Sequence, residues 1–244
     1  MFQNEENINK GDYDNRTPLH ICCSIGNYEI AKKLIDIAKK CDCDAVKFQA
    51  FDEKIVSEHP KKSRLLKSSV SRDNIEQINS ISKKIGIEWY CTPMYPDAID
   101  FLDSFVKRYK IRYDDSLPLH ENKTTPLISK ALETEKQIIV STQKNPKQLE
   151  LYNNNNVKWL YVVPKYPCSI DELDFSNLSD FDGFSNHCIH FLAPLSAVIL
   201  GAKMIEIHVT SNKDKDFIDN PVSFDTNETK KLVTLIRYAE KMQK

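Results

Sequence analysis

Two histidines in the last quarter of the chain have the chemistry of metal ligands. His187 closes an apolar run that begins at Phe181, and His208 closes one that begins at Met204, so each stands at the end of a strand-like segment. Neutral imidazole is a common ligand of divalent cations, and two such ligands leave coordination positions open for a substrate. The alternative is that each histidine is half-buried and hydrogen-bonded without binding a metal.

Further polar side chains stand at or near the carboxyl ends of other strand-like runs. Two ammonium groups and three hydroxyls predict a site for an oxyanion, because lysine supplies charge and hydroxyls supply directed donors. Lys47 lies between two apolar residues, where burial would be costly without an anion; the alternative is that its ammonium reaches solvent from the strand end. The five residues are Lys47, Thr92, Lys110, Ser141 and Ser185.

Short apolar runs alternate with segments of helical period, which is typical of βα units around a parallel sheet. The predicted strands are 20–25, 45–51, 88–93, 108–113, 137–142, 157–163, 181–187 and 204–210. The predicted helices are 28–41, 72–85, 95–106, 125–133, 146–152, 193–201 and 227–242. Eight strands predict an α/β fold, a (β/α)8 TIM barrel, with its active site at the carboxyl ends of the strands. We expect residues 1–16 to form a polar N-terminal extension and residues 17–244 a single barrel domain.

Composition excludes several classes of function. The 34 basic and 35 acidic residues nearly balance, which disfavours a nucleic-acid partner, and no run is apolar enough for a membrane span. Seven cysteines without paired CxxC spacing predict reduced thiols in a soluble, cytoplasmic protein. With only five glycines, no glycine-rich phosphate loop is available, so side chains must hold any phosphate.

Six segments together resemble the sialic acid synthase (N-acetylneuraminate synthase) family. They are residues 44–49, 91–93, 109–111, 138–142, 184–187 and 201–208, and Tyr166-Pro167 also fits the family's pattern. The resemblance implies an enzyme that condenses phosphoenolpyruvate with the open-chain aldehyde of an N-acylated amino sugar. It also implies a divalent metal cation, manganese or magnesium, and a nine-carbon 2-keto sugar acid and phosphate as products.

The family pattern implies roles for individual residues. Lys47, Thr92, Lys110, Ser141 and Ser185 correspond to residues that bind phosphoenolpyruvate, and His187 and His208 to the metal ligands. Asp115 and Asp219 correspond to residues that contact the sugar. Asp115 could also assist proton transfer to the aldehyde oxygen or activate water, so it and His208, through the metal, are the predicted catalytic residues.

The chain departs from the family at several predicted site positions. Ser24 replaces a glutamate, Tyr113 a serine, Tyr161 a histidine, Pro164 an Asn or Ser, and Asn186 an Asp; Gln143 replaces a glycine. The sequence ends without the family's antifreeze-like domain, whose arginine reaches the partner's acceptor site in family dimers. We therefore expect a homodimer or a separate antifreeze-like protein as partner.

Two other functions fit the same residues. The departures suggest a catalytically impaired relative that binds an anion or a partner protein without turnover. A barrel lyase or aldolase would need a lysine that forms a Schiff base, and Lys110 is the candidate.

Overall fold

The structure is a computed structural model that describes residues 28–58, 62, 66, 69–210, 213–214 and 220–242. Its main sheet has seven parallel strands that pair in chain order. They are β1 (Ala45–Ala50), β2 (Glu88–Pro93), β3 (Arg108–Ile111), β4 (Gln137–Thr142), β5 (Val157–Val162), β6 (Gly183–Ser185) and β7 (Met204–Glu206). These strands confirm seven of the predicted ones; the predicted strand 20–25 lies outside the described residues.

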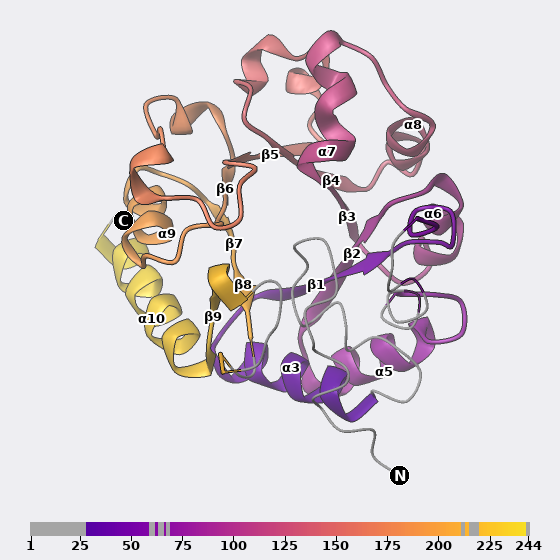
Figure 1. The fold of residues 1–244 in the computed structure, drawn as a ribbon, viewed down its shortest axis with the longest axis horizontal. Helices are drawn as coiled ribbons and strands as arrows, with labels where there is room; N and C mark the ends of the chain where they lie inside the picture. Colours follow the sequence, from indigo (N-terminus) through magenta and orange to yellow (C-terminus); the bar gives the residue numbers. More distant parts are fainter. Residues whose placement is uncertain are drawn as a thin grey trace.

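Helices cover the outside of the ring of strands (Figure 1). They are α3 (Tyr28–Lys40), α5 (Ile75–Ile85), α6 (Pro96–Leu102), α8 (Pro126–Glu133), α9 (Leu192–Ile199) and α10 (Thr226–Met242). Apolar residues at helical spacing face the sheet; α5, for example, buries Ile75, Ile78 and Ile81. Pro126 is the first residue of α8, where a missing N–H costs nothing, and Thr125 caps that helix by accepting from the backbone of Ile128.

Most predicted elements differ from the structure at their ends, and three differ in kind, length or pairing. Residues 146–152 form the 3-10 helices η2 (Pro146–Gln148) and η3 (Glu150–Asn153), because Leu149 between them is extended, with φ −109° and ψ 140°. The predicted strand 108–113 ends at Ile111, and α7 (Tyr113–Ser116) and η1 (Leu117–Glu121) follow it. The last predicted strand is divided at Ile207, because β7 pairs with β6 whereas β8 (His208–Val209) pairs with β9 (Ser223–Phe224).

Alternation along the strands separates an apolar layer from a polar interior. Phe48 and Trp89 are buried against each other under the helices, with ring centroids 6.0 Å apart. Their neighbours Lys47 and Gln49 point to the opposite face, into the barrel, because successive side chains of a strand alternate. The interior therefore collects the polar residues of the strands.

Side-chain contacts link the two edges of the seven-stranded sheet. Lys47 on β1 forms an ion pair with Glu206 on β7, at 3.0 Å between Nζ and Oε2. On the outside, Arg237 of α10 contacts Asp44, just before β1, at 2.7 Å. This is the arrangement of a (β/α)8 barrel, the predicted fold class.

Candidate active site

Five polar side chains meet inside the barrel. Lys110 Nζ donates to Ser141 Oγ at 2.5 Å, and Ser185 Oγ donates to Glu206 Oε1 at 2.7 Å. Glu206 also lies 3.0 Å from the Lys47 ammonium and 3.9 Å from that of Lys110. The structure thus brings together four of the five residues predicted to bind an oxyanion, and adds Glu206.

Glu206 is the residue that sequence reasoning missed. Burial acts to raise its pKa, but the ammonium groups of Lys110 and Lys47 and the Ser185 hydroxyl outweigh burial and hold that pKa well below its usual range. Glu206 is therefore an ionised counter-ion inside the barrel. Its position two residues before His208, on the same face of the chain, was a signal that could have found it.

Burial and the nearby carboxylate have opposite effects on the pKa of Lys110. Burial lowers the pKa of Lys110 to about 8, although the nearby Glu206 carboxylate acts to raise it. A lysine that is only 2% exposed and keeps its proton at neutral pH attracts an anion strongly, because little water screens it.

Thr92, the fifth predicted residue, is fully buried, and its hydroxyl has no hydrogen-bond partner among the described residues. The side-chain carbonyl of Gln49, next to it in the parallel register, is also buried without a partner there. Buried polar atoms in a native protein normally have partners. We define the anion ring as Lys47, Thr92, Lys110, Ser141, Ser185 and Glu206. The Thr92 hydroxyl is the donor in it that has no hydrogen-bond partner among the described residues.

The two predicted metal ligands lie side by side. The rings of His187 and His208 have centroids 5.3 Å apart at 72° and are 5% and 4% exposed. Burial lowers the pKa of both to about 3; the other imidazole acts in the same direction on His187, and Lys47 on His208. Both rings are therefore neutral at physiological pH, the form in which imidazole binds metals.

The orientation of His187 fits metal binding. Its Nδ1 lies 2.8 Å from the carbonyl oxygen of Val163, so Nδ1–H donates there and the lone pair of Nε2 is available to a cation. The ring of Tyr166 packs on that of His187, with centroids 3.8 Å apart. Within the described residues, no group of three or more His, Cys, Asp or Glu side chains could hold a metal.

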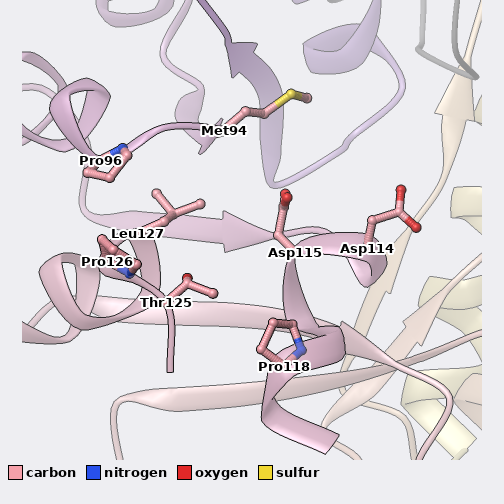
Figure 2. A pocket seen from close by; sticks show the side chains of 8 residues that line it. All are labelled: Met94, Pro96, Asp114, Asp115, Pro118, Thr125, Pro126 and Leu127. Carbon is pink, nitrogen blue, oxygen red and sulfur yellow. The ribbon is translucent and has the colours of Figure 1, made fainter. Parts of the chain in front are cut away.

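Asp115 lies at the mouth, beyond the anion ring. Both of its carboxylate oxygens accept from Arg112, at 2.7 Å from Nε and 3.1 Å from Nη2. Asp115 also lines a pocket of about 370 Å³ (Figure 2), which we call the acidic pocket. Its lining residues are Met94, Pro96, Asp114, Asp115, Pro118, Thr125, Pro126 and Leu127. Asp219, the other residue predicted to contact the sugar, lies outside the described residues, as does Ser24.

The remaining departures from the family pattern fall in different places. Tyr161 faces outward, where its ring packs against Phe181 and Phe184, so its replacement of a histidine does not alter the barrel interior. The side chain of Asn186 bonds the backbone of Cys188 in a local turn. Tyr113 begins α7, with its ring edge-on to His120 at 6.2 Å, whereas Pro164 is exposed after β5.

A family model described as the NeuB family matches residues 34–244, so the chain belongs to the NeuB family. This confirms the predicted family. An uncharacterized protein of Methanocaldococcus jannaschii is 31% identical over 235 residues, which are 89% of this chain and 68% of that protein. The N,N'-diacetyllegionaminic acid synthase of Campylobacter jejuni is 28% identical, over 88% of this chain and 73% of that enzyme.

Two further relatives extend the comparison. The N-acetylneuraminate-9-phosphate synthase of Homo sapiens is 24% identical over 88% of this chain and 67% of that enzyme. Among solved structures, the N-acetylneuraminic acid synthetase of Leptospira borgpetersenii superposes with a TM-score of 0.77 and 24% identity. That superposition covers 89% of this chain and 80% of the synthetase, and it supports the fold.

A second family model, described as ankyrin repeats, matches residues 1–35. The match covers residues 20–25, predicted as the first strand, and overlaps the start of α3. The segment Thr17-Pro18-Leu19-His20 is a sequence signature of that repeat, and sequence reasoning missed it. The division into an extension (1–16) and a barrel (17–244) stays a prediction.

Two smaller findings bear on the class of protein. None of the helices in the described part of the chain is both long and apolar enough to cross a membrane. Cys41, Cys43, Cys91, Cys168 and Cys188 are free thiols, as predicted for the cysteines that the structure describes.

Proposed function

We propose that the protein condenses phosphoenolpyruvate with the aldehyde of an N-acylated amino sugar to give a nine-carbon 2-keto sugar acid and phosphate. The single observation that supports this most is the anion ring beside two neutral imidazoles. A site for a charged donor substrate next to a cation site, both inside the barrel, suits the joining of an anionic enol to an aldehyde. Membership of the NeuB family, with curated relatives named as synthases of sugar acids, agrees with this function.

Phosphoenolpyruvate would bind in the anion ring. Lys47 and Lys110 supply charge to its phosphate and carboxylate, and Thr92, Ser141 and Ser185 donate hydrogen bonds. Glu206 would hold both ammonium groups in place before the substrate arrives, which would limit reorganisation on binding.

His187 and His208 would hold a divalent cation, manganese or magnesium. When bound, the cation would supply Lewis acidity toward the aldehyde oxygen. Val163 fixes the tautomer of His187, and Tyr166 fixes the position of its ring, so the available nitrogen keeps one direction.

The chemistry forms one carbon–carbon bond and one carbon–oxygen bond to water, and breaks the carbon–oxygen bond to phosphate, so that the keto oxygen comes from the water. The methylene carbon of phosphoenolpyruvate bonds to the aldehyde carbon, and the aldehyde oxygen becomes a hydroxyl. Water adds at the former enol carbon, and the bond from that carbon to the phosphate oxygen breaks. Asp115, fixed by Arg112 at the mouth, would assist the proton transfer to the aldehyde oxygen or activate the water. Asp219 would contact the sugar.

The test is incubation of the full chain with phosphoenolpyruvate, manganese and a panel of N-acylated hexosamines, followed by phosphate release and mass spectrometry of the product. The proposal expects one phosphate for each 2-keto sugar acid. A rise in melting temperature with phosphoenolpyruvate but no turnover with any sugar would favour an impaired relative that only binds. Borohydride trapping of a keto acid on Lys110 would instead identify an aldolase.

A matched pair of variants makes the test specific. Lys110→Met removes a ring ammonium and should lower affinity for phosphoenolpyruvate by about a hundredfold, the equivalent of roughly 2.7 kcal/mol. Lys107→Met removes an exposed lysine just before the same strand and should leave that affinity unchanged. Equal behaviour of the two variants would remove Lys110 from the site.

A further inference from the structure

The mouth end of β4 is bonded to the segment that follows β3. β3 and β4 are neighbours in the sheet, and α7 packs on β4 (Figure 1). Ser116, the last residue of α7, is buried, and its hydroxyl donates to the backbone carbonyl of Ser141 at 2.8 Å. In η1, Nε2 of His120 lies 2.8 Å from Oγ1 of Thr142. Two consecutive residues of β4 are therefore bonded to this segment, and one of them belongs to the anion ring.

The hydrogen bonds of Thr142 set the direction of its buried hydroxyl. Its oxygen accepts from the backbone N–H of Lys144 at 3.1 Å, so its own hydrogen is available to a second group. The carbonyl oxygen of Lys144 is 3.4 Å away, whereas Nε2 of His120 is 2.8 Å away. The shorter distance assigns the hydrogen to His120, which then accepts through Nε2. Burial and the charge of Lys144 lower the pKa of His120, which favours this neutral ring.

The hydroxyl of Ser141 is directed in a similar way. Its Oγ accepts from the Lys110 ammonium at 2.5 Å, so its O–H is available to a ligand oxygen. That arrangement depends on the backbone at the end of β4, which the next residue, Thr142, fixes through His120. The Lys144 ammonium also donates to the carbonyl of His120 at 2.7 Å, so η1 and the turn after β4 hold each other from both sides.

We propose that His120 is a positioning residue of the phosphoenolpyruvate site. It accepts the hydrogen of Thr142, and Thr142 keeps the Ser141 hydroxyl against the ammonium of Lys110. His120 acts through these residues and does not touch the substrate. The inference rests on the proposed function, because it takes Ser141 and Lys110 to bind phosphoenolpyruvate. It adds a residue from η1 that neither residue type nor spacing predicted.

The experiment compares two replacements of His120 in the full chain. His120→Leu removes the acceptor, whereas His120→Gln keeps one, because a glutamine side-chain carbonyl reaches about as far as Nε2. Calorimetry measures affinity for phosphoenolpyruvate in the presence of manganese, and phosphate release measures kcat and KM. We expect His120→Leu to weaken binding and raise the KM for phosphoenolpyruvate about threefold to tenfold, with kcat nearly unchanged. His120→Gln should recover most of the loss.

Two further variants make the comparison specific. Thr142→Val removes the donor of the same hydrogen bond, and it should cause a loss of similar size even if His120→Leu does not fold. His190→Leu, the same exchange at an exposed histidine, should leave affinity and KM unchanged. A replacement that only destabilises the fold reduces the number of active molecules, so it lowers kcat without changing KM.

The outcomes separate this inference from the proposed function. Weaker binding by His120→Leu with recovery in His120→Gln would support the inference even without turnover of any sugar, a result that would contradict the condensation reaction alone. Unchanged affinity in His120→Leu, an equal loss in His120→Gln, or a lower kcat with an unchanged KM would overturn the inference. Turnover by the wild type would then leave the reaction standing.

Discussion

The anion ring and the acidic pocket lie next to each other at the barrel mouth, but they hold charge in opposite ways. In the ring, Lys110 and Glu206 are buried and matched to each other, so the cost of burying charge is met before any ligand binds. In the pocket, Asp114 is exposed and the walls are apolar. The difference is that charge inside the barrel is paired between neighbouring side chains, whereas the Asp114 carboxylate in the pocket is exposed to solvent.

The largest expected effect concerns the cation that we propose His187 and His208 hold. His208→Ala should lower turnover by about a thousandfold, since a Lewis acid contributes several kcal/mol to a step that develops negative charge. A chelator should reduce the wild type to the same level. His190→Ala, which changes an exposed histidine, is the control and should keep full activity. If the His208→Ala protein kept its activity and a chelator did not change that activity, the proposed cation site would be wrong. Only the assignment of the anion ring would then stand.

The second effect tests the matched charges of the ring. Glu206→Gln leaves two ammonium groups without their carboxylate and should lower the free energy of unfolding by about 3 kcal/mol. Glu172→Gln breaks a surface pair with Lys165 and should leave the melting temperature nearly unchanged. Thermal unfolding of the two variants checks this. Similar melting temperatures would show that the buried ion pairs of Glu206 stabilise the protein no more than the surface pair does.

The third effect is the pH dependence of the ring. Because Lys110 carries its charge below a pKa of about 8 and loses it above, the affinity for phosphoenolpyruvate should fall as pH rises through 8. Between pH 7 and pH 9 the loss should be about tenfold, if only the protonated form binds. Calorimetry at both pH values measures this affinity. The Lys110→Arg variant stays charged throughout and is the control. If the affinity of the wild type for phosphoenolpyruvate changed as little with pH as that of the variant, the assignment of Lys110 to the phosphoenolpyruvate site would be wrong.

The smallest expected effect is on the KM for the sugar when the ion pair between Arg112 and Asp115 is removed. Arg112→Ala frees the Asp115 carboxylate, adds negative charge to the pocket and loosens a residue at the mouth. We expect the KM for the sugar to rise about threefold to tenfold, roughly 1 kcal/mol, with affinity for phosphoenolpyruvate nearly unchanged. Steady-state kinetics with each substrate varied in turn separate the two constants. An equal loss for both substrates would place Arg112 in the ring.

Sequence patterns predicted the ring better than the surroundings. Alternation along β1 and β3 puts Lys47 and Lys110 on the inner face, and register then sets them among the hydroxyls, so residue type and spacing were enough. Glu206 was not assigned, because its partners come from strands far apart in the chain. Residues 146–152 have helical composition, but the extended backbone at Leu149 and the cap of Asn145 on Lys147 divide them.

The pocket could not be predicted from the sequence for a different reason. Its walls come from the segment after β2, from α7 and η1, and from the start of α8, and no local pattern indicates that Met94, Pro118 and Leu127 meet. Near the N-terminus, a short apolar run alone does not decide between strand and helix. Residues 20–25 were predicted as a strand, and they belong to a segment that matches ankyrin repeats.

Anomalous diffraction from crystals grown with manganese and phosphoenolpyruvate is the most direct measurement of the central claim. The account predicts one manganese peak bound by His187 and His208, with phosphoenolpyruvate density within hydrogen-bond distance of Lys47, Lys110 and Thr92. A peak elsewhere, or phosphoenolpyruvate bound away from the carboxyl ends of β1 to β3, would contradict it.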